Sequence, residues 1–166
     1  MAELTPQQIA RIEYLVHDEW VLDSDSPEDE LNSKANFRAA LAKMSSIELH
    51  HFAQHFNWDG GTEELECVID HPKCDAGTAL LIFWLAGPVD CFRRAAKGKL
   101  QDSEVETYEW LKRIESRFVS NEFAQSEIAV NPREERLTMG TDLHREYINE
   151  RMFVPTPGTE LERLSF

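Results

Sequence analysis

The chain has 166 residues, of which 42% are hydrophobic and 29% charged, so length and composition predict a single globular domain with its own core. Acidic residues number 31 against 17 lysines and arginines, and this excess argues against nucleic acid or an anionic membrane surface as partner. No segment has the roughly 18 apolar residues of a membrane span, and the first residues lack a secretory signal, so we expect a cytoplasmic protein.

The N-terminal region predicts three capped helices. Thr5-Pro6-Gln7-Gln8 is a capping box with proline at the first helical position, and it predicts a helix over about residues 6–21. Residues 22–30 are expected to be an acidic connection, after which Ser33 caps a second helix. A second capping box, Ser45-Ser46-Ile47-Glu48, opens the third helix.

Residues 63–86 predict two short helices that meet at a corner. His71-Pro72 ends the first helix, because proline disfavours the α conformation for the residue before it. Asp75 is the expected N-cap of the second helix. The stretch from Ala76 to Ala86 carries no charged residue, which is typical of a helix that is buried on most sides.

The rest of the chain predicts a short helix that starts near Pro88 and a longer amphipathic helix after a capping box at Ser103-Glu104-Val105-Glu106. Residues 122–128 could extend that helix or form a short one, and residues 143–152 could form one more. No alternation of period two is present, so we expect an all-α fold. Short stacked helix hairpins, HEAT-like or in a compact bundle, would form one domain over residues 1–153, followed by an extended tail over residues 154–166.

The negative charge is concentrated in the first part of the chain. Residues 1–92 hold 17 acidic residues against five basic ones, and no basic residue lies between Arg11 and Lys34 or between Lys43 and Lys73. A field of this sign attracts a basic protein, although acidity that only keeps the protein soluble is an open alternative. The expected partner-binding residues are two aromatic anchors and the acids near them: Trp20, Asp23, Asp25, Glu28, Asp29, Glu30, Trp58, Asp59, Glu63, Glu64, Glu66 and Asp70.

Metal sites are the main alternatives that the residues leave open. His51 and His55, with Asp59, could serve a metal-dependent hydrolase, but the glutamate of the HExxH motif is missing. Two further sets match no established pattern: the zinc set Cys67, His71, Cys74 and Cys91, and the calcium set Asp23, Asp25 and Glu28. We therefore expect no metal, no cofactor and no catalytic residue, with all three cysteines reduced. The basic cluster Arg93, Arg94, Lys97 and Lys99 lacks the interleaved aromatics of a nucleic-acid site.

Three motifs resemble a known family. They are the turn Asn57-Trp58-Asp59-Gly60, the corner His71-Pro72-x-Cys74-Asp75-x-Gly77-Thr78-Ala79-Leu80, and the helix end Phe83-x-Leu85-Ala86. Over about residues 45–120, the chain resembles a bacterial family of domains of unknown function with a WD turn and an HPxCDxxTAL corner. The resemblance implies no established activity, and Cys74, Asp75 and Thr78 have structural roles at the corner.

Small acidic proteins of this type are similar to the immunity proteins that are encoded beside secreted bacterial toxins. That similarity implies a binding protein, not an enzyme, which neutralises a basic toxin by occluding its active site. A self-associating scaffold subunit, and hence a homo-oligomer, is a further alternative.

Overall fold

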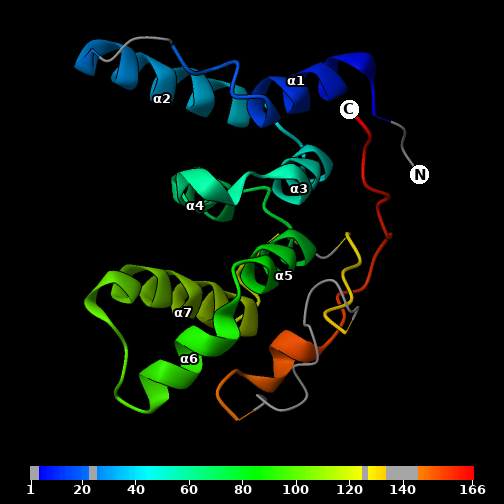
Figure 1. Cartoon of the computed structure of the whole chain (residues 1–166). Helices are drawn as coiled ribbons and strands as arrows, with labels where there is room; N and C mark the ends of the chain where they lie inside the picture. The colour runs from blue at the N-terminus through cyan, green and yellow to red at the C-terminus, as the bar shows by residue number, and fades with distance from the viewer. Residues whose placement is uncertain (1–3, 23–25, 125–126, 134–145) are drawn as a thin grey trace. The chain divides into compact units, whose positions relative to one another are not determined.

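The computed structural model describes residues 4–22, 26–124, 127–133 and 146–166. Within these ranges the chain forms seven α-helices and no β-strand, so the expected all-α class is confirmed. The chain divides into two compact units, which we call the N-terminal unit (Met1–Cys74 with Glu162–Phe166) and the C-terminal unit (Asp75–Leu161) (Figure 1). The single domain expected over residues 1–153 stays a prediction.

The N-terminal unit contains α1 (Pro6–Val16), α2 (Pro27–Leu41), α3 (Ser46–His55), the 3₁₀ turn η1 (Trp58–Gly60) and α4 (Glu63–Ile69). Helix α1 packs against α2 and α3, and α3 packs against α4. Ile12, Leu49 and Leu65 come from three of these helices and are completely buried. Near the other end of the chain, the Phe166 ring packs against His55, with 4.8 Å between ring centroids.

Helix α1 ends at Val16, which corrects the predicted end at residue 21. Asp18 adopts a left-handed conformation with φ of 55°, and the Glu19 N–H donates to the Tyr14 carbonyl at 3.1 Å. These features form a Schellman motif, and aspartate is one of the few residues whose short polar side chain tolerates this conformation. Trp20 therefore lies in the turn after α1 and not on the helix.

Helix α2 begins at Pro27, so the prediction that Ser33 caps this helix is wrong. Ser26 is the N-cap and accepts the Asp29 N–H at 3.1 Å, whereas Ser33 lies buried within the helix and accepts the Leu22 N–H at 2.9 Å. The part of the predicted acidic connection from Pro27 to Glu30 is thus the first helical turn. Proline suits this position, and carboxylates there are stabilised by the helix dipole.

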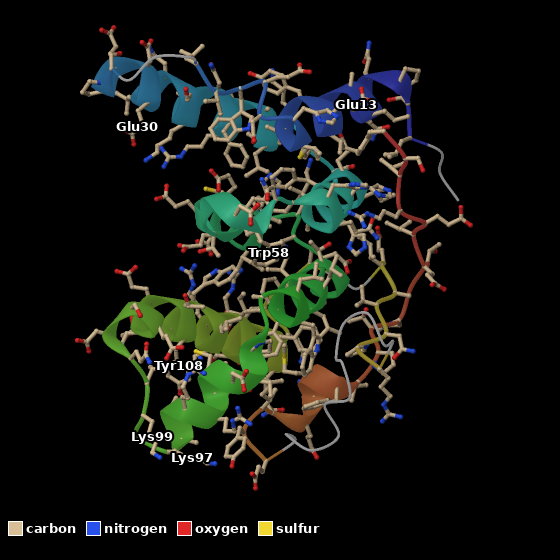
Figure 2. All side chains as sticks on the ribbon, in the orientation of Figure 1. Glu13, Glu30, Trp58, Lys97, Lys99 and Tyr108 are labelled. Atoms are coloured by element: carbon tan, nitrogen blue, oxygen red, sulfur yellow. The ribbon has the colours of Figure 1, made fainter. Side chains whose placement is uncertain are left out.

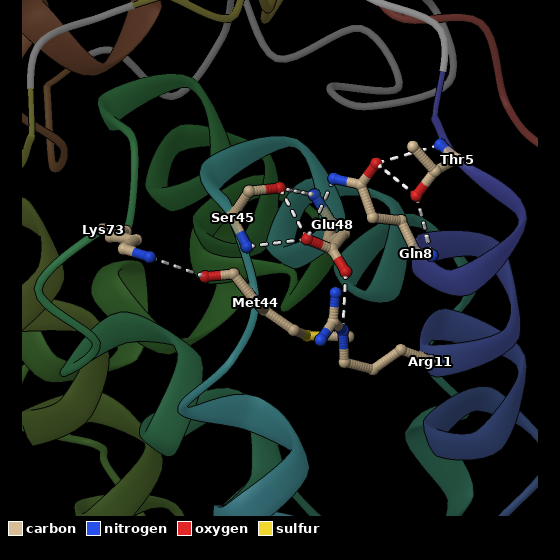
Figure 3. Close-up of polar contacts among 7 residues, drawn as sticks. All are labelled: Thr5, Gln8, Arg11, Met44, Ser45, Glu48 and Lys73. Atoms are coloured by element: carbon tan, nitrogen blue, oxygen red, sulfur yellow. Dashed lines mark hydrogen bonds and ion pairs between the residues drawn. The ribbon is translucent and has the colours of Figure 1, made fainter.

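Helix α3 begins at the predicted capping box, and its Glu48 carboxylate also connects α3 to α1 (Figure 3). Glu48 is only 1% exposed, and it accepts hydrogen bonds from the Ser45 N–H at 2.8 Å, Arg11 Nε at 2.8 Å and Gln8 Nε2 at 3.3 Å. Burial alone would raise the pKa of Glu48, but these hydrogen bonds outweigh burial and the pKa lies below its usual value. Glu48 therefore adds no charge to the surface.

The C-terminal unit contains α5 (Ala76–Leu85), α6 (Pro88–Ala96), the 3₁₀ turn η2 (Asp102–Glu104), α7 (Val105–Val119) and the 3₁₀ turn η4 (Glu150–Phe153). Helices α5 and α6 and both turns pack against α7. Every residue of α5 from Gly77 to Trp84 is buried, which confirms the predicted core helix. Trp84 Nε1 donates to the Met152 carbonyl at 2.8 Å and so fixes η4 on α5.

Three predicted local structures in this unit are wrong. Ser103 lies in η2 and does not cap α7; instead, the Glu104 carboxylate accepts the Gln101 N–H at 3.1 Å. The described part of residues 122–128 is not helical, because α7 ends at Val119 and Asn121 then adopts a left-handed conformation with φ of 55°; residues 125 and 126 lie outside the described ranges. Of the helix expected over residues 143–152, the described part forms a turn followed by η4, and residues 143–145 lie outside the described ranges.

Two extended segments, residues 127–130 and 156–159, pair with each other. The Ala129 N–H donates to the Thr159 carbonyl at 2.9 Å, and the Thr156 N–H donates to the Val130 carbonyl at 3.0 Å. The described residues after Phe153 contain no helix, as expected for the extended tail. Across the described part of the chain, no single helix is long and apolar enough to cross a membrane, and α5 and α6 reach that length only as a pair bent by 73°.

Candidate functional site

Two acidic stretches of the sequence contain no lysine or arginine: the one between Arg11 and Lys34 and the one between Lys43 and Lys73. In the N-terminal unit, carboxylates from both stretches meet at Lys34. Its Nζ lies 3.0 Å from Glu30 Oε1, on α2, and 3.6 Å from Glu63 Oε2, on α4. The hydrogen bond to Glu30 and the charges of both carboxylates raise the pKa of Lys34. We call Glu30 and Glu63, together with Glu28 from the same first turn of α2 and Glu64 beside Glu63 on α4, the acidic face; Figure 2 shows Glu30 on α2. The tertiary structure thus brings together carboxylates that are far apart in sequence.

Some of the predicted binding acids also have a structural role. Glu28, Asp29 and Glu30 form the acidic first turn of α2, where a negative charge stabilises a helix N-terminus. Asp29 in addition accepts a hydrogen bond from the Ser26 hydroxyl at 2.7 Å. Stability of α2 therefore explains part of the negative charge, and pairing with Lys34 explains why Glu63 lies near Glu30.

The other predicted acids lie in different surroundings. Asp59 is exposed in η1, and Asp70 is exposed at the C-cap of α4. Glu66 is half-buried on α4. Asp23 and Asp25 lie outside the described residues, so the structure does not place them.

The two predicted aromatic anchors stand at the ends of one row of rings. Trp20 contacts Phe37 with 5.1 Å between ring centroids, and Phe56 contacts Trp58 at 5.5 Å. Phe52 joins the two pairs, at 5.9 Å from Phe37 and 5.8 Å from Phe56. Both tryptophans are half-buried, so each presents only part of its ring to solvent.

A pocket of about 200 Å³ opens beside Trp20. Its walls are mostly apolar and come from α1, the following turn, α3 with the residues just after it, and α4. The lining residues, which include two carboxylates, are Leu15, Val16, Asp18, Trp20, Val21, Phe52, Phe56, Asn57 and Glu64. A smaller hollow of about 40 Å³ shares Trp20 and Glu64 and also touches Lys34 and Glu63. Trp20 and Glu64 therefore link the pocket to the acidic face.

The turn and the corner that carry the family resemblance are both ordered in the structure. Asn57 caps η1 by accepting the Asp59 N–H at 3.2 Å, and Asp75 caps α5 by accepting the Gly77 N–H at 2.7 Å. Residues 44–119 match the family model of DUF4274, a domain of unknown function. No curated protein and no solved structure matches the chain significantly.

The DUF4274 match begins just before α3 and ends with α7, and it contains both motifs. It includes Trp58, Glu63 and Glu64 but not α1 or α2, so Trp20 and Glu30 lie outside it. The acidic face and the pocket thus combine residues of the DUF4274 region with residues that precede it.

The histidines and cysteines of the metal hypotheses lie within the DUF4274 region, but the structure does not gather them into a ligand set. Among the residues that the structure describes, no group of three or more His, Cys, Asp or Glu side chains could hold a metal ion. His51 is buried with its Nδ1 3.0 Å from Gln54 Oε1, and burial lowers its pKa. The calcium hypothesis cannot be placed, because Asp23 and Asp25 lie outside the described residues.

The C-terminal unit holds a larger pocket that the sequence analysis did not foresee. It measures about 580 Å³ and includes Phe118, Phe123, Arg151 and Pro155 in its walls. Arg151 Nη2 donates to Asn121 Oδ1 at 2.8 Å, which fixes the guanidinium near the end of α7. These residues come from two distant stretches, and no local pattern in either stretch predicts their contact.

Proposed function

We propose that the N-terminal unit binds a basic protein and that the acidic face beside Trp20 makes the contact. The position of Lys34 between Glu30 and Glu63 carries this proposal, since it locates both acidic runs on neighbouring surfaces of α2 and α4. Lys34 offsets only part of the charge of the four carboxylates, so this surface would attract an oppositely charged partner.

Charge and apolar contact would have different tasks in this interaction. Exposed ion pairs contribute only about 0–1 kcal/mol each, so the acidic face would mainly accelerate and orient association. Affinity would come from buried aromatic surface. The half-buried Trp20 and the apolar walls of its pocket provide such surface next to the carboxylates.

The role that we propose is that of an immunity protein, which would act in the bacterial cytoplasm and occlude the active site of a basic secreted toxin. Two features support this role: the net charge of −14, concentrated in residues 1–92, and the resemblance to small acidic immunity proteins. The DUF4274 match itself assigns no activity.

Charge reversal on the acidic face tests the proposal. A partner captured from the source cytoplasm should be basic, and the variant Glu28→Lys, Glu30→Lys and Glu63→Lys should slow its association about tenfold or more at low salt. Stopped-flow kinetics at several salt concentrations measure this rate. The effect should shrink as salt screens the charges.

The matched control reverses three exposed acids of the C-terminal unit, Glu106→Lys, Glu109→Lys and Glu160→Lys. This variant changes the net charge by the same amount as the reversal on the acidic face. It should nevertheless retain most of the association rate of the original protein. Equal rates for both variants would show that net charge alone matters and would contradict the acidic face as the binding surface.

A further inference from the structure

The pocket beside Trp20 has the size of one long side chain. Its volume is about 200 Å³. Pockets for drug-sized molecules usually measure about 300–1,000 Å³, so this one is too small for most of them. The apolar walls, which include Leu15, Val21 and Phe56, suit an aliphatic or aromatic group and not a fully hydrated ion.

Two carboxylates give this pocket a charge preference. Asp18 is held in place by the left-handed turn that ends α1, and Glu64 projects from α4. In the part of the chain that the structure describes, neither carboxylate forms an ion pair with a lysine, arginine or histidine of the protein itself. A cationic group that enters the pocket would find two carboxylates available.

Trp20 adds an aromatic wall whose presence stability alone does not explain. Its Nε1 is buried and meets no acceptor among the described residues. An unpaired buried N–H destabilises the folded state, and a phenylalanine would fill much of the same space without that penalty. An indole ring, however, binds a cation on its face better than a phenyl ring does.

We infer that the Trp20 pocket receives an arginine side chain of the basic partner. The aliphatic stem would lie along Leu15 and Val21, and the planar guanidinium would stack on Trp20 while it donates hydrogen bonds to Asp18 and Glu64. Arginine fits better than lysine, because its guanidinium both stacks on aromatic rings and binds carboxylates bidentately. This inference rests on the proposed function and names the side chain that the partner would insert.

Short peptides test the inference without the partner. The probes are the blocked tripeptide Ac-Gly-Arg-Gly-NH₂ and its citrulline analogue, which has nearly the same shape but no charge. The full chain is labelled with ¹⁵N, and the indole N–H signal of Trp20 is assigned with the variant Trp20→Phe. We expect the arginine peptide to shift this signal saturably, with a dissociation constant of about 1–10 mM.

The citrulline peptide should bind at least about fivefold more weakly, because it cannot pair with the carboxylates. Glu64→Gln and Asp18→Asn should each weaken arginine binding by about threefold or more. Glu106→Gln removes an exposed carboxylate of the C-terminal unit that does not line the pocket, and it should change binding less than twofold.

Three results would overturn the inference: no shift of the Trp20 signal, equal binding of both peptides, or indifference to both pocket substitutions. None of them would by itself contradict the proposed function, which the reversal of Glu28, Glu30 and Glu63 tests separately. If that reversal slows association but the arginine peptide does not bind, the result supports the acidic face as the binding surface and contradicts the binding of arginine in the Trp20 pocket.

Discussion

The Glu48 carboxylate is buried and yet charged, which is stable only because several donors surround it. Arg11, Gln8 and Ser45 supply hydrogen bonds from α1 and from the N-cap of α3. A carboxylate that accepts several hydrogen bonds keeps its charged form in a buried site. Glu48 therefore stabilises the contact between α1 and α3 and does not contribute to the negative charge of the surface.

We predict that Glu48→Gln lowers the free energy of unfolding by about 1–3 kcal/mol, because it leaves Arg11 without its counter-charge and replaces one acceptor oxygen with a donor. Urea unfolding followed by circular dichroism measures this loss. Glu109→Gln, on an exposed position of α7, should stay within about 0.5 kcal/mol of the original protein. A comparable loss in both variants would contradict the role of Glu48.

At the scale of elements, the start of α5 depends on a close approach of the chain from residues 127–128. Asp75 Oδ1 accepts the Gly77 N–H, and its Oδ2 accepts the Glu127 N–H, both at 2.7 Å. A Cβ atom on Gly77 would lie only 2.2 Å from the Ile128 carbonyl oxygen. The corner therefore needs an aspartate to join the two segments and a glycine to let them meet.

Gly77→Ala should lower the free energy of unfolding by about 2–4 kcal/mol, although alanine is the better helix former by about 1 kcal/mol. The added methyl group must displace backbone, which cannot move aside as a flexible side chain would. Thr107→Ala, on an exposed position of α7, also raises helix propensity and should be neutral or slightly stabilising. Thermal and urea unfolding compare the two, and a stabilised Gly77→Ala would refute the close approach.

At the scale of the whole molecule, acid should destabilise the fold through the histidines of the N-terminal unit. Burial lowers the pKa of His50 to about 3, and it also lowers the pKa values of His51, His55 and His71. In the unfolded chain these side chains titrate near pH 6.5. Below that pH the unfolded state binds protons that the folded state does not bind. The free energy of unfolding therefore decreases as the pH decreases.

The expected loss between pH 7.5 and pH 5 is about 2 kcal/mol from His50 alone, with further loss of the same sign from the other three. The lowered pKa of Glu48 adds to this loss only at more acidic pH, below its unfolded value. Urea unfolding at a series of pH values measures the slope. His50→Gln should make the slope shallower, and an unchanged stability from pH 7.5 to 5 would contradict the burial of neutral histidines.

Much of the helical structure is encoded locally and could be predicted from the sequence. The caps at Thr5, Ser45 and Asp75 form as predicted, because each depends on residues no more than three positions away. The uncharged run in α5 likewise predicted its burial. The start of α2 is harder to predict, although Ser26-Pro27 signals it, because a first turn of three acidic residues has the composition of a solvent-exposed connection.

The candidate site is predictable only in part: charge and aromatic content indicate Trp20, Glu30, Glu63 and Glu64, but they do not single out Asp18 or Phe56. The sequence by itself determined an acidic, all-α protein with most of its net negative charge in residues 1–92. Only the tertiary structure decided that Glu48 and Asp75 are internal, that Lys34 lies between Glu30 and Glu63, and that a pocket opens beside Trp20. The physical reason is that caps and helical periodicity act over a few residues, whereas burial and charge pairing depend on which distant segments pack together.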